Sequence, residues 1–294
     1  MIRRCTWHPS RSRSISRSTT LTSDNYLRVL SSWPSSPFSS SFRCSATSRS
    51  PSRVRVSRTE RPPPHDWNAM IDRWNDQHAP SDDDPLAQRV YTSRLLGSDP
   101  NLVLHGGGNT SVKIQEPDFF GVPTDVLYVK GSGWDLATIE APGFAPVRMD
   151  ALLRLAERDV LSDSDMVRQQ RVALLEPAAP NPSVEAILHA IIPHRFVDHT
   201  HADAIIAMSN TPDGASWIEA TFGSRMLIVP YVMPGFALCK LVANMTRGVD
   251  WSSIDGMVLM NHGIFTFADD ARSAYRAMIG FVDRAERAVA VRTG

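Results

Sequence analysis

The sequence predicts a layered α/β domain that covers about residues 65–294. Segments with strand character and segments with helix character are mixed through this range without strict alternation, which favours one layered domain. The chain has 294 residues and a hydrophobic content of 42%, enough for one large domain or two small ones with a buried core. We find no internal repeat.

The predicted elements begin after the proline run at 62–64. A short helix is expected near 67–77, and the acidic turn at 81–85 is expected to cap a second helix at 86–96. Strands are expected at 110–115, 126–130, 196–201, 226–229 and 257–260. Further helices are expected at 149–159, 184–192, 202–209, 237–246 and 271–291.

The N-terminal segment 1–64 has a different composition from the rest of the chain. Its first 60 residues hold 11 Arg, no Lys, 18 Ser and two acids, a formal charge of +9, whereas the remainder has 20 basic and 29 acidic residues, a charge of −9. A Ser/Arg-rich segment with few aliphatic residues cannot bury enough surface to offset its chain entropy, so we expect it to be disordered.

Three interpretations of this segment remain open. It could be translated sequence upstream of the true start, an organellar transit peptide, or a basic tail that binds nucleic acid. The chain contains only three Lys, so its Arg content partly reflects codon bias, and this favours the first interpretation. We therefore expect no nucleic-acid partner.

The remaining composition points to the cytoplasm. No run of about 18 apolar residues occurs, so no membrane span is expected. Cys5, Cys44 and Cys239 are widely separated and form neither a disulfide framework nor a CxxC pair. This pattern is typical of a reducing compartment.

The strongest local signal is the motif VDHTH at 197–201. Strand side chains alternate between faces, so His199 and His201 are expected to point to the same side, where two imidazoles can bind one metal ion. Such a pair alone is more often two ordinary histidines. His262, directly after the apolar run 257–260, would complete a three-histidine set of the kind that holds catalytic zinc and leaves one position open.

A carboxylate in the motif PNPSVE at 180–185 is the candidate acid/base. Asn181 is expected to cap a helix with Pro182 at its first position, which places Glu185 in the first turn. Glu185 could be a solvated partner of the helix dipole, or a general acid/base that faces the metal. His189, one turn later, is expected to support the structure rather than bind the metal.

Two glycine-rich stretches could bind an anion. HGGGNTS at 105–111 precedes a predicted strand, and KGSG at 130–133 follows one. Backbone N–H groups in such segments can hold an anion, and a helix beginning near Ser183 would add further donors. Neither stretch has the spacing of a P-loop or a dinucleotide fingerprint, and tight turns explain each of them about as well.

The order of these motifs resembles the class II aldolase/adducin N-terminal domain family. GGGN-x-S, GSG, PS-x-E, H-x-H and N-H-G occur in that order, and the likeness covers about 85–292. Together with PYVMPGFA at 230–237, it is closest to the aldolase half of rhamnulose-1-phosphate aldolase/short-chain dehydrogenase fusion proteins.

The resemblance implies a three-layer α/β/α sandwich around a central mixed sheet. It also implies a homo-oligomer with its site near a subunit boundary, Zn²⁺ as the cofactor and Glu185 as the catalytic acid/base. The implied zinc ligands are His199, His201 and His262. The substrate phosphate is implied to lie near Asn109, Ser132, Gly133 and Ser183.

The implied activity is reversible cleavage of a ketose 1-phosphate, such as rhamnulose 1-phosphate, to dihydroxyacetone phosphate and an aldehyde. The alternatives are a sugar-phosphate epimerase, a methylthioribulose-phosphate dehydratase, a non-catalytic adducin-head-like interaction module, or an inactive fragment. Val184 stands where many members have a second Ser, and the segment from Glu185 to His199 is shorter than in single-domain fuculose-phosphate aldolases. No dinucleotide fingerprint occurs, so no oxidoreductase activity is assigned.

Overall fold

The structure, a computed structural model, describes residues 70–293. The predicted disorder of 1–64, the predicted boundary at 64/65 and the three interpretations of the leader lie outside the described residues. Among those residues, no helix combines the length and the apolar character needed to cross a membrane.

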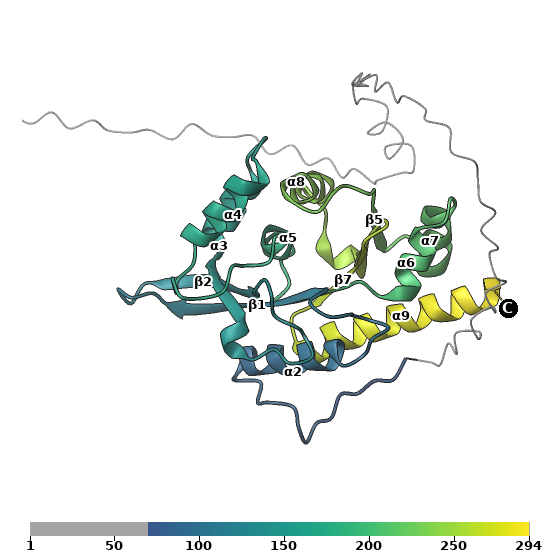
Figure 1. Cartoon of the computed structure of the whole chain (residues 1–294), viewed down its shortest axis with the longest axis horizontal. Helices are drawn as coiled ribbons and strands as arrows, with labels where there is room; N and C mark the ends of the chain where they lie inside the picture. Colours follow the sequence, from purple (N-terminus) through teal and green to yellow (C-terminus); the bar gives the residue numbers. More distant parts are fainter. Residues whose placement is uncertain (1–69, 294) are drawn as a thin grey trace, which may run out of the picture. The chain divides into compact units, whose positions relative to one another are not determined.

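A seven-stranded sheet forms the centre of the described region (Figure 1), in the order β3-β2-β1-β4-β7-β6-β5. Only β5 and β6 pair in parallel; the other neighbours are antiparallel, so the sheet is mixed as predicted. The strands are β1 (Asn109–Pro117), β2 (Pro123–Lys130), β3 (Phe144–Arg148), β4 (Phe196–Thr200), β5 (Met226–Val229), β6 (Gly256–Leu259) and β7 (Gly263–Ala268).

Helices cover both faces of this sheet. The α-helices are α2 (Pro85–Gly97), α3 (Met149–Ala156), α4 (Asp163–Val172), α5 (Ala186–Ile191), α6 (Asp203–Ser209), α7 (Gly214–Phe222), α8 (Phe236–Met245) and α9 (Ala271–Thr293). Short 3₁₀ turns lie at η1 (Ala141–Gly143) and η2 (Trp251–Ser253).

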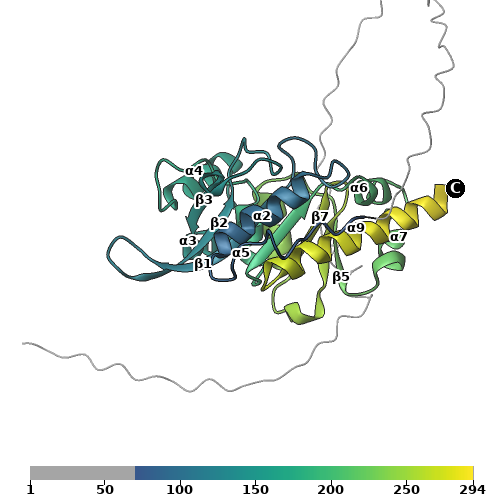
Figure 2. The same ribbon diagram turned by 90° about the horizontal axis from the view of Figure 1, so that it is seen from below.

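Two large hydrophobic cores and one small cluster lie between three layers, which confirms the predicted α/β/α sandwich. One large core joins the sheet to α3, α4, α5 and α8, and the other joins it to α2, α6, α7 and α9. Figure 2 shows α2 and α9 lying across the face of the sheet that the second core covers. Side-chain alternation along β6 supplies both cores, because Met257 and Leu259 enter the first and Val258 enters the second.

Most of the predicted elements are confirmed to within a few residues. Asp84 caps α2 as predicted, since its carboxylate accepts a hydrogen bond from the Ala87 N–H at 2.9 Å. The helix predicted at 67–77 is wrong over its described part, 70–77. There, Asp72 accepts from the Trp74 N–H and Asn75 from the Gln77 N–H, and such side-chain bonds compete with helix formation.

The predicted helix cap at Asn181 is also wrong. The helix begins at Ala186 with Glu185 in the capping position, so Glu185 lies just before the first turn. The preceding backbone pairs with the end of β2 instead: the Ser132 N–H donates to the Asn181 carbonyl at 2.7 Å, and the Ser183 N–H donates to the Lys130 carbonyl at 3.1 Å. This strand-like pairing satisfies the backbone groups that a longer helix would have used.

Two strands and two α-helices, β3, β7, α4 and α7, were not predicted, and neither were the two 3₁₀ turns. Pro146 lies within β3, which is tolerated because β3 is an edge strand. Helix α4 is mostly polar and buries only Met166 and Gln170, so it has little apolar periodicity.

Candidate metal centre

The three predicted ligand histidines lie on β4, just after β4 and in the turn that leads into its neighbour β7. His199 lies in β4, His201 follows directly after that strand, and His262 lies in the turn between β6 and β7. A Cβ atom on Gly263 would lie 2.3 Å from the Thr200 carbonyl oxygen, so the absence of a side chain lets β7 approach β4 closely. The close approach brings His262 to the end of β4.

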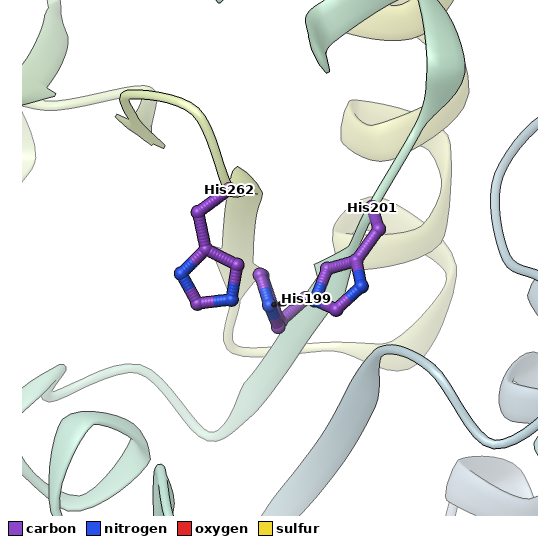
Figure 3. Close-up of side chains that lie close together, drawn as sticks. All are labelled: His199, His201 and His262. Carbon is purple, nitrogen blue, oxygen red and sulfur yellow. Dashed lines mark hydrogen bonds between the residues drawn. The ribbon is translucent and has the colours of Figure 1, made fainter. Parts of the chain in front are cut away.

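The three imidazole rings surround one point (Figure 3). Their centroids lie 4.8 Å apart for His199 and His201 and 5.0 Å apart for each of the other two pairs. One candidate ligand atom from each residue lies within 4.8 Å of the others. The structure therefore brings His262 next to His199 and His201, which lie far from it in the sequence.

The ring of His199 is held with one nitrogen free for a metal ion. Its Nδ1 lies 3.0 Å from the Ile264 carbonyl oxygen, which can only accept a hydrogen bond, so Nδ1 carries the proton. In the neutral ring, Nε2 then presents its lone pair, and it lies 3.0 Å from Nε2 of His201. Phe265 stacks on the same ring at 4.2 Å between centroids. Bonding of the second ring nitrogen is typical of metal-binding histidines.

Burial keeps these rings neutral. It lowers the pKa of His199 well below its ordinary value, helped by the neighbouring His201, and it lowers the pKa of His201. Burial, together with the nearby His199, lowers the pKa of His262 to about 4. Neutral imidazole is the form that binds metal, so all three can act as ligands near neutral pH.

The donor set fits a zinc ion. Zinc binds histidine nitrogen at about 2.0–2.1 Å in a tetrahedron, which separates ligand nitrogens by roughly 3.3 Å, close to the His199–His201 spacing. Nδ1 of His262 and Oε1 of Glu185 are buried and have no hydrogen-bond partner among the described residues. Three neutral rings beside a carboxylate match the open, three-ligand pattern of catalytic zinc.

Glu185 lies against this cluster and is 4% exposed. Its Oε1 lies 3.5 Å from Nε2 of His262, and its Oε2 lies 3.5 Å from Nε2 of His199. The side-chain amide of Asn109 donates to Oε2 at 2.6 Å. Each carboxylate oxygen therefore lies beside one histidine; Oε2 is also held by Asn109, whereas Oε1 has no hydrogen-bond partner among the described residues.

His189 lies outside the cluster formed by His199, His201 and His262. Its ring is fully buried and bonds to the Ser111 hydroxyl and the Asn109 side chain. The contribution of Ser111 was not predicted. Its one sequence signal is the spacing N-x-S, because residues two apart on a strand share a face. Asn109 pairs directly with His199 across the sheet, so this face is the one beside the cluster.

The segments predicted to bind an anion meet beside this cluster. Gly131 forms an isolated bridge with Pro182, which brings the turn carrying Ser132 and Gly133 next to Ser183. The Lys130 ammonium donates to the Gly106 carbonyl at 2.9 Å, which ties the GGG loop to the end of β2. Asn109 differs from Ser132, Gly133 and Ser183, since its side-chain amide donates to Glu185.

Lys130 was also not predicted as a site residue. It is 5% exposed, and burial lowers its pKa, against the opposing effects of Asp135 and Glu185. A buried ammonium beside a carboxylate and a glycine-rich turn adds positive potential at that turn.

The face of β4 opposite His199 carries a buried ion pair. The Arg89 guanidinium on α2 lies 2.6 Å from Asp198, and both side chains are fully buried. Arg89 also donates to the carbonyl oxygens of Ser111 and Val197 at 3.1 and 3.3 Å. This pair anchors α2 to the strand that carries His199.

Comparison with known proteins identifies the family. The family described as "Class II Aldolase and Adducin N-terminal domain" matches residues 87–289. A Bacillus subtilis (strain 168) protein named "Uncharacterized oxidoreductase YuxG" is 38% identical over 215 residues, which cover 73% of this chain and 31% of that protein. The chain thus matches less than a third of that relative's length.

Solved structures agree with this match. The N-terminal class II aldolase domain of a conserved Thermoplasma acidophilum protein is 43% identical with a TM-score of 0.69, and the match covers 75% of this chain and 100% of that one. A sugar-phosphate aldolase from Thermotoga maritima is 14% identical with a TM-score of 0.52, and the match covers 71% of this chain and 95% of that one, a likeness of fold alone. This chain therefore belongs to the class II aldolase and adducin N-terminal domain family.

Proposed function

We propose that this protein is a zinc-dependent aldolase that reversibly cleaves a ketose 1-phosphate to dihydroxyacetone phosphate and an aldehyde. The observation that carries the proposal is the convergence of three neutral imidazoles beside a buried carboxylate whose Oε1 has no hydrogen-bond partner among the described residues. An interaction module without chemistry has no need for such a set. Membership of the family supports the reaction class.

His199, His201 and His262 would hold the zinc ion. Bound there, zinc supplies Lewis-acid stabilisation of the negative charge that develops on substrate oxygens during cleavage. Because all three ligands are neutral, the positive charge of the ion is not offset by its protein ligands.

Glu185 would act on the proton at the reacting carbon. In cleavage, the bond between C3 and C4 breaks, the C4 hydroxyl loses its proton and becomes the carbonyl of the aldehyde, and C3 receives a proton, so the net change moves one proton from O4 to C3. Oε1 is the atom suited to deliver this proton, since Asn109 occupies Oε2. In the synthetic direction, the same oxygen removes the proton from dihydroxyacetone phosphate.

The substrate phosphate would lie against Ser132, Gly133 and Ser183. These residues are adjacent in the structure, and the Lys130 ammonium lies at the base of the same turn. Asn109 can contribute as well, because its amide nitrogen has two hydrogens and Glu185 takes one of them.

The sugar is proposed from the resemblance to the rhamnulose-1-phosphate branch, with a lactaldehyde-type second product. We further propose a homo-oligomer in the cytoplasm. The Thermotoga maritima neighbour, named as a sugar-phosphate aldolase, is compatible with a sugar phosphate as substrate.

The first expected result concerns the metal. The purified full chain should carry about one zinc per chain and cleave rhamnulose 1-phosphate, and a chelator should abolish cleavage until zinc is restored. Coupled assay of dihydroxyacetone phosphate measures the rate, and mass spectrometry of all products separates cleavage from epimerisation or dehydration. Full activity in protein stripped of metal would refute the proposal.

The second expected result concerns the acid/base. Glu185→Gln should retain zinc and lower kcat by about 10²–10⁴-fold, because a neutral amide cannot exchange the proton. Glu219→Gln, at an exposed position on α7, is the matched control and should have the kcat of the parent protein. Normal turnover of a zinc-loaded Glu185→Gln protein would remove Glu185 from this role.

A further inference from the structure

Four buried polar side chains form a continuous chain that leads to the catalytic carboxylate. The Ser111 hydroxyl lies 2.8 Å from Nδ1 of His189, Nε2 of His189 contacts Oδ1 of Asn109, and the Asn109 amide lies 2.6 Å from Oε2 of Glu185. Ser111 and His189 are fully buried, and Asn109 is 6% exposed. The residues come from β1, α5 and the capping position of α5, so only the fold joins them.

The chemistry of each group gives this chain one direction. An ionised carboxylate can only accept, so the Asn109 amide nitrogen must donate to Glu185, and its oxygen then faces His189. That oxygen can only accept, so Nε2 of His189 must carry the proton. The neutral ring then has its lone pair on Nδ1, and the Ser111 hydroxyl donates to it.

Burial removes the other arrangements of the chain. It lowers the pKa of His189 well below its ordinary value, so the ring is neutral and has a single N–H. Ser111 and His189 have no exposed surface, so a broken bond between them would leave a buried polar atom unsatisfied.

Phe265 packs between the hydrogen-bonded residues and the three-histidine cluster. Its ring meets the edge of His189 at 5.4 Å between centroids, and it stacks on His199 at 4.2 Å. One side chain thus packs against a candidate metal ligand and against the ring that orients Asn109.

We propose that Ser111, His189 and Asn109 form a one-way hydrogen-bond chain that fixes Oε2 of Glu185 and leaves Oε1, beside His262, without a hydrogen-bond partner and available to the substrate. His189 is the central positioning residue: it touches neither metal nor substrate and acts through Asn109. The catalytic consequence rests on the proposed function of Glu185, whereas the direction of the chain does not.

The direction is tested without any assay of activity. Long-range ¹H–¹⁵N correlation spectra of the imidazole groups, assigned with His189→Gln, should show a neutral His189 ring protonated at Nε2. The His189 signals should report the same tautomer with and without added zinc. A ring protonated at Nδ1, or a charged ring near neutral pH, would overturn the chain as drawn.

The positioning role is tested with a pair of substitutions. His189→Leu removes the donor, whereas His189→Gln places an amide N–H near the position of Nε2. We expect His189→Leu to lower kcat for exchange of the dihydroxyacetone phosphate proton with D₂O by about 10–100-fold at unchanged KM and zinc content. His189→Gln should recover most of this loss.

The possible failures are distinguishable. If the parent protein exchanges no proton, the proposed function fails, and the His189 tautomer still decides the hydrogen-bond chain. If the parent is active and His189→Leu keeps the parental kcat, the positioning role is wrong. Should His189→Leu not fold, Ser111→Ala replaces it, with a smaller loss of kcat expected and an unchanged kcat again counting against the role.

Discussion

Replacing His262 with alanine is expected to remove zinc from the protein and with it nearly all activity. Two remaining imidazoles cannot complete the three-ligand set, and a Lewis acid contributes several kcal/mol to the barrier. At about 1.4 kcal/mol for each factor of ten, kcat/KM should fall on the order of 10³-fold. Zinc per chain, measured after gel filtration, should fall from about one to near zero.

His262 is the best of the three histidines for this test. It lies in a turn, and its side chain is 12% exposed, whereas His199 is fully buried within β4. His78, an exposed histidine outside the cluster, gives the matched control, and His78→Ala should keep both zinc and activity. A His262→Ala protein with full zinc content would show that the ion binds elsewhere.

Asp198→Asn is expected to cause the largest loss of stability. The substitution removes the charge that neutralises Arg89 where both side chains are fully buried. Breaking one partner of a buried pair typically costs about 3–5 kcal/mol, since the other charge stays buried without compensation. Such a loss is a large part of a domain's total stability. Urea unfolding, followed by circular dichroism with zinc and without it, measures the change.

The control for this prediction is a second ion pair of the same length. Asp255 lies 2.6 Å from Arg225, but both side chains are about half exposed. Exposed pairs contribute about 0–1 kcal/mol, so Asp255→Asn should have little effect. Equal losses of unfolding free energy for the two substitutions would mean that burial does not determine how much the Arg89–Asp198 pair contributes to stability.

Local sequence predicted the elements whose signals lie within a few residues. The Asp84 cap precedes α2 in the sequence, and the apolar runs at 226–229 and 257–260 lie on β5 and β6 with at most one residue of shift. The HxH motif at 199–201 was also predicted from local sequence, because the alternation of side chains along a strand depends only on neighbouring residues. Where side chains offered the backbone a local alternative, as at Asp72 and Asn75, the helix prediction failed.

The sequence by itself determined which chemical groups this protein has available. These are the imidazoles of the HxH motif at 199–201, the imidazole of His262 before Gly263, and the carboxylate of Glu185. Tertiary structure alone decided the rest. It replaced the cap predicted at Asn181 with pairing to the end of β2. It also placed the side chain of Asn109 between His189 and Glu185, with its oxygen toward His189 and its amide nitrogen toward Glu185. The physical reason is that these contacts join residues about 50–80 positions apart, and their strength depends on burial, which no local pattern of residues specifies.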